Sequence, residues 1–231
     1  MKGWIQVAGI RDAAEARLCR EAGADLLGFP FRLPVHREDL SEAAAAGLIA
    51  ELGLGSRAVL ITYLERAEAI AELADFLGTG WVQLHGAISP AELRALRARR
   101  PQLRLIRSLV IRGGDAAGPL ATLQACEPWV NAFLTDSHDP LSGADGATGR
   151  VHDWSVSRQL RAATTRPLIL AGGLRPANVA AAIRAVGPAA VDAHTGLEDA
   201  SGAKDPARLA AFVAAARRAF RKQDEPSGSA N

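Results

Sequence analysis

Residues 167–193 read PLILAGGLRPANVAAAIRAVGPAAVDA, and the fold prediction starts from this stretch. An apolar run at 167–170 is followed by two glycines, an alanine-rich segment at 177–186 and a second apolar run at 189–193. Short apolar runs are typical of strands that are buried on both faces, and alanine favours a helix. The stretch therefore predicts a β-α-β unit with two parallel strands.

The same alternation recurs along the whole chain. The predicted strands lie at 4–8, 25–29, 58–62, 81–84, 103–110, 130–135, 167–170 and 189–193. The predicted helices lie at 12–21, 41–52, 67–77, 89–99, 117–125, 154–163, 177–186 and 206–220. This pattern predicts an α/β fold, a single (β/α)8 TIM barrel. An open doubly wound sheet is the alternative, but the regular spacing and the lack of an edge-like strand favour the barrel.

Length and charge set limits on the class of protein. The chain has 231 residues, and its 27 basic and 25 acidic side chains give a net charge of +2, which indicates neither a nucleic-acid partner nor a membrane-surface partner. No run of about 18 apolar residues and no signal-peptide pattern is present, so a cytoplasmic protein is expected. A monomer and a homodimer both stay open. The barrel is predicted over residues 1–222, and the polar segment 223–231 is predicted to be a disordered tail.

The cysteines and histidines give no sign of a metal site. Cys19 and Cys126 are too few for a disulfide framework or a cysteine-rich zinc site, and both are expected to be buried. His36, His138 and His152 fall in predicted loops and are expected to be solvated. No histidine pair has metal-binding spacing and no nucleotide-binding motif is present, so neither a metal nor a cofactor is predicted.

Glycines follow the last two predicted strands, where a barrel carries its functional residues. Gly172 and Gly173 come after the seventh strand, and Thr195 and Gly196 come after the eighth. Glycine allows close backbone approach, and free amides near a helix start attract phosphate. The pair of loops predicts a phosphate site, although each alone is also explained as a simple turn.

Three more polar residues follow other predicted strands. Asp136 opens a long loop, where a partly shielded carboxyl can act as a general acid, or can simply organise the loop. Arg37 could clamp a carboxylate or phosphate, or lie on the surface. His85 ends the fourth strand and could donate a hydrogen bond to a ligand, or cap the barrel rim.

Several of these segments together resemble the phosphoribosylanthranilate isomerase family of tryptophan biosynthesis. The matching segments are 9–10 (GI), 21–29 (EAGADLLGF), 82–86 (VQLHG), 133–137 (FLTDS), 147–154 (ATGRVHDW), 171–178 (AGGLRPAN), 191–198 (VDAHTGLE) and 202–205 (GAKD). The resemblance implies a (β/α)8 barrel that isomerises an N-phosphoribosyl aminoaldose to an aminoketose by an Amadori rearrangement, without a cofactor. A small phosphorylated substrate is therefore expected.

The resemblance also implies roles for individual residues. Asp136 stands at the position of the family's general acid, and Arg37 at that of the anthranilate carboxylate anchor. Gly173, Thr195 and Gly196 stand in the phosphate loops. His85, Gly172 and Asp192 fall within matching motifs and are expected to contact the substrate as well.

The chain departs from the family pattern at positions that the resemblance places in the catalytic site. The family's first strand carries K-I-C-G-I, whereas residues 6–10 are QVAGI, so Ala8 stands where the catalytic cysteine should be. General acid–base catalysis contributes ~10²–10⁴-fold, and a methyl group cannot take a proton. The family's paired serines after the eighth strand are His194 and Thr195, and residues 29–37 keep only Arg37 of the usual S-P-R run.

His194 is the candidate replacement for the lost base. Strand eight neighbours strand one in a closed barrel, so the ends that carry His194 and Ala8 should be adjacent. An imidazole titrates near neutral pH and suits proton abstraction. The alternative is that His194 packs beside the phosphate loop or points outward.

Three functions therefore remain open on the sequence. The chain is a phosphoribosylanthranilate isomerase with a relocated base, a relative acting on another phosphorylated or carboxylated substrate, or a non-catalytic ligand- or partner-binding relative. The natural substrate does not follow from the sequence.

Overall fold

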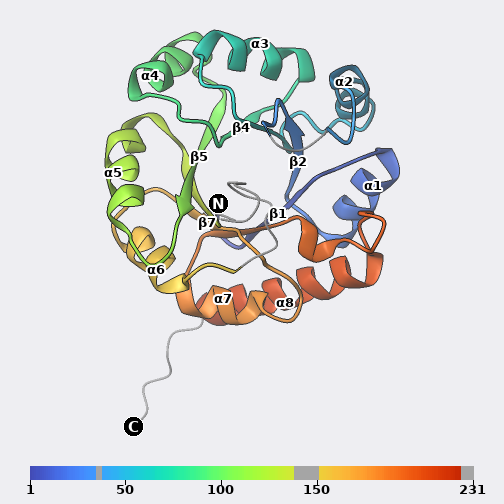
Figure 1. Ribbon diagram of the computed structural model, residues 1–231. Coiled ribbons are helices and arrows are strands. Elements are labelled where there is room, and N and C mark those ends of the chain that lie inside the picture. Colours follow the sequence, from blue (N-terminus) through green and yellow to red (C-terminus); the bar gives the residue numbers. More distant parts are fainter. Residues whose placement is uncertain (35–37, 138–150, 225–231) are drawn as a thin grey trace.

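The computed structural model describes residues 1–34, 38–137 and 151–224. Its strands are β1 (Trp4–Ala8), β2 (Leu26–Phe31), β3 (Ala58–Thr62), β4 (Trp81–Leu84), β5 (Arg104–Ile111), β6 (Ala132–Ser137), β7 (Leu168–Leu170) and β8 (Ala190–Ala193). They form a closed parallel barrel in sequence order, because β8 pairs with β1 from Trp4↔Ala190 to Val7↔Ala193. The predicted (β/α)8 barrel is confirmed (Figure 1).

Helices surround the barrel on the outside (Figure 1). They are α1 (Ala13–Ala22), α2 (Glu42–Glu51), α3 (Ala67–Leu77), α4 (Pro90–Arg99), α5 (Ala117–Cys126), α6 (Trp154–Ala162), α7 (Val179–Val186) and α8 (Pro206–Asp224), with short 3₁₀ turns η1 (Glu127–Trp129) and η2 (Thr195–Leu197). Local chemistry starts several of them: the side chains of Asp12, Ser41 and Ser89 each accept a hydrogen bond from the amide three residues on.

Several elements run further than the sequence predicts, because tertiary contacts extend them. β6 continues to Ser137, since Asp136 and Ser137 pair with Val110 and Ile111 of β5, so Asp136 lies in the strand and does not open the loop as predicted. β2 continues to Phe31, since Pro30 and Phe31 pair with Ile61 and Thr62 of β3. Helix α8 continues to Asp224, and Gln223 donates a 2.7 Å hydrogen bond to the carbonyl of Ile183 in α7. The predicted start of the tail at residue 223 is therefore two residues too early, and residues 225–231 lie outside the described part of the chain.

The barrel interior positions the functional residues. Apolar side chains that point inward fill its lower layers; among them are Leu26, Val59, Ile61, Ile106, Leu134, Ile169 and Ala190. Side chains alternate along a strand, so the next inward positions on β6, β7 and β8 are Asp136, Ala171 and Asp192. Polar groups thus replace the apolar filling at the carboxyl ends of the strands.

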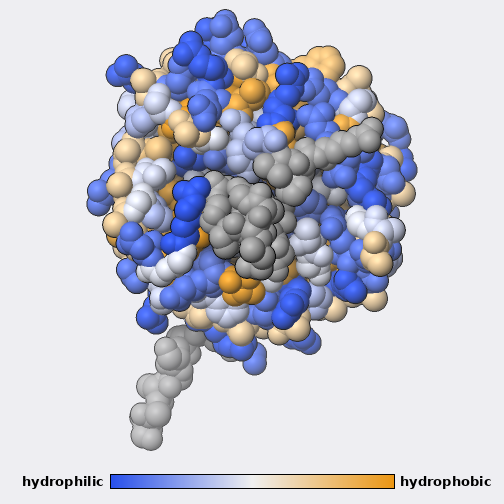
Figure 2. All heavy atoms as spheres, viewed as in Figure 1, coloured by the Kyte–Doolittle hydropathy of each residue, from blue (hydrophilic) through white to orange (hydrophobic). Residues whose placement is uncertain are grey.

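The surface has no large apolar area among the described residues. Phe76 and Val151 are the large apolar side chains that are substantially exposed there. On the face seen in Figure 2, the apolar residues form only small groups, and hydrophilic residues separate these groups. No helix within residues 1–34, 38–137 and 151–224 has the length and apolar character needed to cross a membrane.

Candidate active site

A cavity of about 370 Å³ lies at the carboxyl ends of the strands. The predicted site residues that line it are Asp136, His194, His85, Gly172, Gly173, Asp192, Thr195 and Gly196. Ala8 lines it too, in the place where the resemblance implies a cysteine. Arg37 lies outside the described residues, so its predicted anchoring role stays a prediction.

Asp136 and Asp192 stand at the same level of the barrel. Thr135 of β6 pairs with Leu170 of β7, which pairs with Val191 of β8, and the aspartates are the next residues along their strands. Both are more than nine-tenths buried. Burial first, and then the negative charge of Asp136, raise the pKa of Asp192 to about 8.

A chain of side-chain hydrogen bonds crosses the barrel to His85. Gln6 Nε2 donates to Gln83 Oε1 at 2.7 Å, and Gln83 Nε2 lies 2.8 Å from His85 Nε2. An amide nitrogen only donates, so His85 Nε2 accepts and the ring carries its proton on Nδ1. Burial, with a smaller effect of Arg107, lowers the pKa of His85 to about 3. The ring is therefore neutral, and it lies beside Tyr63 with the ring centroids 5.3 Å apart.

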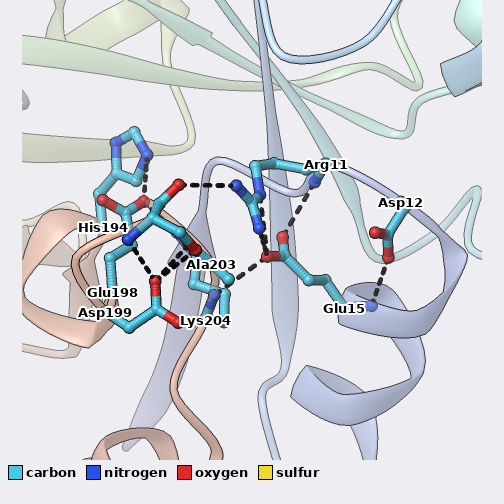
Figure 3. A network of polar contacts seen from close by, with 9 residues as sticks. Arg11, Asp12, Glu15, His194, Glu198, Asp199, Ala203 and Lys204 are labelled. Atoms are coloured by element: carbon cyan, nitrogen blue, oxygen red, sulfur yellow. Dashed lines mark hydrogen bonds and ion pairs between the residues drawn. The ribbon is translucent and has the colours of Figure 1, made fainter.

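His194 belongs to a charged network that joins the end of β8 to α1 (Figure 3). Its Nε2 lies 3.1 Å from Glu198 Oε1, which also accepts a 2.6 Å hydrogen bond from the fully buried Lys204 ammonium. Burial raises the pKa of Glu198, but the hydrogen bonds from His194 and Lys204 outweigh it and lower that pKa to about 2. An ionised carboxylate only accepts, so Nε2 of His194 carries a proton and donates it to Glu198.

The same network is anchored to the first loop. The Lys204 amide donates to Glu15 Oε1 at 3.0 Å, and the Glu15 carboxylate also binds the Arg11 side chain. Figure 3 shows these groups in one line, running from the His194 ring to the start of α1. The imidazole is therefore held by a buried support that extends well beyond its own loop.

Gly9 makes room for the His194 ring. A Cβ placed on Gly9 would lie 2.0 Å from His194 Nε2, and the backbone there has φ +74°. The ring thus packs on the backbone next to Ala8 and lines the cavity that contains Asp136, rather than pointing to the outer helices. Its role in proton transfer stays a prediction.

The glycine loops form another wall of the cavity. Gly172 and Gly173 both have positive φ, and the backbone amides of Gly173 and Gly196 find no hydrogen-bond partner within the described part of the chain. A Cβ on Gly196 would lie 2.0 Å from the carbonyl oxygen of Leu174, so the two loops are in direct contact. Free amides at a left-handed turn are suited to an anion.

His152 supports this wall, and its surroundings show that the prediction of a solvated side chain is wrong. It is not solvated: its Nε2 lies 2.6 Å from Ser157 Oγ, and burial lowers the pKa of the ring to about 4. A Cβ on Gly172 would lie 2.9 Å from His152 Nδ1, so the ring packs under the loop. No sequence motif indicated this contact, because it depends on how α6 and β7 meet.

Sequence reasoning also missed the apolar part of the cavity. Pro30, Leu33, Ile61 and Tyr63 line it at the ends of β2 and β3. The inward alternation of β2 and β3 could have indicated Pro30 and Ile61, but not the loop residue Leu33.

Neither cysteine belongs to the cavity. Cys19 in α1 and Cys126 at the end of α5 are buried, as expected, and burial raises the pKa of Cys19 to about 12. Among the described residues no cluster of three His, Cys, Asp or Glu side chains could hold a metal ion.

Comparison with known proteins identifies the family. A family model described as N-(5'phosphoribosyl)anthranilate (PRA) isomerase matches residues 6–215. The chain belongs to this family. The resemblance inferred from the sequence motifs is thus confirmed, and so is the assignment to a PRA isomerase-like class of enzyme.

Individual relatives of the PRA isomerase family match over nearly their full length. N-(5'-phosphoribosyl)anthranilate isomerase 2 of Methanosarcina mazei is 35% identical over 219 residues, covering 94% of this chain and 96% of the relative. The isomerase of Moorella thermoacetica is 39% identical over 228 residues, covering 97% and 94%.

Solved PRA isomerases have the same architecture. The enzyme of Thermotoga maritima aligns with a TM-score of 0.79 at 28% identity, covering 94% of this chain and 100% of that one. A PRA isomerase in complex with reduced 1-(o-carboxyphenylamino)-1-deoxyribulose 5-phosphate aligns with a TM-score of 0.77 at 27% identity, covering 94% and 100%.

Proposed function

We propose that this chain isomerises an N-phosphoribosyl aminoaldose to the corresponding aminoketose, with N-(5'-phosphoribosyl)anthranilate as its substrate. The observation that carries the proposal is the composition of the cavity. Three kinds of group line it: the backbone amides of the glycine loops, apolar and aromatic side chains, and titratable side chains such as Asp136 and His194. A ligand with a phosphate, a sugar and a planar ring matches these three parts, and the ligand named in the related complex has all of them.

The phosphate would bind at the glycine loops. The amides of Gly173 and Gly196 and the hydroxyl of Thr195 are donors at the ends of β7 and β8. The planar ring would lie toward Leu33 and Tyr63, with the neutral His85 as a donor to its carboxylate. Arg37 would provide the charge for that carboxylate.

The chemistry needs one acid and one base. In the proposed first step Asp136 gives a proton to the ring oxygen as the C1–O bond breaks, while the nitrogen lone pair forms a C1=N bond. A base then removes the C2 proton, the C–H electrons form C1=C2, and the iminium becomes a neutral enolamine. The ketone forms when C1 gains a proton and the C2 hydroxyl loses one, so no external reactant is required.

His194 is the base in this proposal. Glu198 holds the Nε2 proton of the imidazole, which leaves Nδ1 as the proton acceptor. Its ring lies beside the backbone of Gly9, next to the position of the missing thiol. We further infer a cytoplasmic location, as expected for a biosynthetic enzyme, and a monomeric or homodimeric state. A related enzyme of Thermotoga maritima is described as dimeric.

Two experiments on the intact chain test the function. Expression in a tryptophan auxotroph that lacks the isomerase should restore growth, and the purified protein should convert N-(5'-phosphoribosyl)anthranilate without an added metal. Binding of the reduced substrate analogue without turnover would instead indicate a relative that acts on another phosphorylated compound. Absence of both binding and turnover would favour a non-catalytic relative.

A further inference from the structure

Two glutamine side chains are buried inside the barrel. Gln6 on β1 and Gln83 on β4 are only 1% and 2% exposed, and the register neighbours of Gln83 are Ile61 of β3 and Ile106 of β5. Burial of an amide is unfavourable unless its groups are hydrogen-bonded. Gln6 Nε2 donates to Gln83 Oε1 at 2.7 Å, and Gln83 Nε2 lies 2.8 Å from His85 Nε2. These three side chains form a hydrogen-bond relay that crosses the barrel.

The hydrogen bonds of the relay run in one direction. The carbonyl oxygen of Gln83 accepts from Gln6, so the amide group of Gln83 presents its nitrogen to His85. An amide nitrogen only donates, so His85 Nε2 accepts and the neutral ring carries its proton on Nδ1. Turning one amide alone would bring two donors or two acceptors into contact. The orientation of the Gln6 amide therefore decides the tautomer of His85.

Asp192 fixes the orientation at the start of the relay. It is the buried register partner of Gln6 on β8. Burial and the charge of Asp136 raise the pKa of Asp192 to about 8, whereas a hydrogen bond from the Gln6 side chain opposes them. Only a donor stabilises an ionised carboxyl, so the nitrogen of Gln6 faces Asp192. Gln6 Oε1 has no hydrogen-bond partner in the described residues, so nothing there holds the amide in the opposite orientation.

The family pattern differs at the first member of the relay. The K-I-C-G-I motif has a lysine where this chain has Gln6. An ammonium only donates, whereas a glutamine can donate or accept. In this chain the direction of the relay therefore depends on the groups around Gln6.

The last member of the relay lies at the cavity. His85 lines it, and Nδ1 of the ring is buried without a hydrogen-bond partner among the described residues. Tyr63 packs beside the ring, with the ring centroids 5.3 Å apart. A buried donor without a partner is unfavourable, and a ligand that brings an acceptor to it removes this cost.

We infer that Gln6 and Gln83 are positioning residues that set the specificity of the cavity, because they hold His85 as a hydrogen-bond donor. The cavity then selects a ligand with a carboxylate or another acceptor at this place and disfavours a ligand that lacks one. The identity of the acceptor as the carboxylate on the planar ring of the substrate rests on the proposed function, whereas the tautomer of His85 does not.

Nitrogen-15 NMR of the unliganded protein tests the tautomer directly, since protonated and unprotonated ring nitrogens have well-separated chemical shifts. At about pH 7 the His85 ring is neutral, because burial lowers its pKa to about 3, and its proton should be on Nδ1. In Gln83→Leu the donor to Nε2 is lost, and the proton should move to Nε2, which a free neutral imidazole prefers to protonate. A wild-type ring protonated on Nε2, or an unchanged tautomer in Gln83→Leu, would overturn the proposal.

Gln6→Lys and Gln6→Met are a matched pair that leaves Gln83 and His85 in place. Lysine only donates, so it should keep the proton of His85 on Nδ1. Methionine has no donor, so the Gln83 amide is free to turn and the proton should be distributed over both ring nitrogens. The same tautomer in both variants would contradict the role given to Gln6. Circular dichroism confirms that each variant is folded.

Binding of two probes tests the specificity. The first is reduced 1-(o-carboxyphenylamino)-1-deoxyribulose 5-phosphate, and the second is its counterpart with a hydrogen in place of the carboxyl group. The wild type should bind the first probe more tightly. In Gln83→Leu the ratio of the two Kd values should shrink about tenfold, the contribution of one hydrogen bond to a charged group, while the second probe binds as before. An equal loss of affinity for both probes would overturn the role in specificity.

Steady-state kinetics separate this inference from the proposed function. With N-(5'-phosphoribosyl)anthranilate, Gln83→Leu should raise KM about tenfold and leave kcat nearly unchanged, because the carboxylate is bound equally in the ground state and the transition state. A protein with the Nδ1 tautomer and the selectivity for the first probe but without turnover would contradict the proposed function and leave this inference intact. Turnover by a wild type whose ring is protonated on Nε2 would overturn this inference and leave the proposed function intact.

Discussion

The glycine loops after β7 and β8 and the end of β1 line one cavity but depend on different chemistry. At the loops the donors are backbone amides of Gly173 and Gly196, which are set by turn geometry. At β1 the resemblance implies a single cysteine side chain as the base, and this chain has Ala8 there. A site made from backbone survives most substitutions, whereas a site made from one side chain is lost with a single change. The comparison explains how a chain can keep the glycine loops and still differ from the family pattern at residue 8.

Asp136→Asn should give the largest effect and separate catalysis from binding. The substitution keeps the shape of the side chain and removes its proton, so kcat should fall by ~10²–10⁴-fold. Binding of inorganic phosphate at the glycine loops, measured by NMR titration, should stay as in the wild type. An unchanged kcat would reduce Asp136 to a loop-organising residue.

His194→Ala tests whether His194 replaces the base that is missing at the end of β1. If the imidazole has replaced the thiol, kcat should fall by about 10²-fold or more while phosphate binding is retained. Ala8→Cys introduced into His194→Ala should recover part of the lost turnover, because a thiol returns to the family position. Full turnover of His194→Ala in steady-state kinetics would end the assignment.

Glu198 binds both His194 and Lys204, and the stability that it contributes to the fold should decrease at low pH. Its pKa is about 2 in the folded protein, against 4.5 for a free glutamate, so the ionised form is stabilised by folding. That stability is fully present above about pH 4.5, is lost as the pH falls toward 2, and amounts to about 3 kcal/mol. The Tm of the wild type should therefore drop over this range. Glu198→Gln should lack that part of the pH dependence, and identical slopes for both proteins would contradict it.

Gly196→Ala should give a smaller effect, confined to the loops. The added Cβ would meet the carbonyl oxygen of Leu174, so the two loops must separate and the amides lose their alignment. Phosphate affinity should fall about tenfold, the cost of one hydrogen bond to an anion. Gly118→Ala, at an open position in α5, is the matched control and should bind phosphate normally. Equal affinities in the two variants would place the phosphate elsewhere.

Local sequence signals predict the fold and the residues at the strand ends, but they do not predict contacts between distant elements. The regular βα pattern was enough to predict the closed barrel, because apolar runs and helix caps are local signals. The rule that strand ends carry function selected Asp136, Gly173 and Gly196, all of which line the cavity. His152 was misplaced, since its burial depends on a helix packing against a distant strand.

The amino-acid order alone determined the fold, the family and the departures from the family pattern, among them those at residues 6 and 8. Only the closed barrel decided what those departures mean. Closure of β8 against β1 places His194 on Gly9 and Asp192 opposite Gln6 in the strand register. These contacts join residues from opposite ends of the chain. No local pattern encodes them, because their electrostatics depend on burial and neighbours that exist only after the strands have closed.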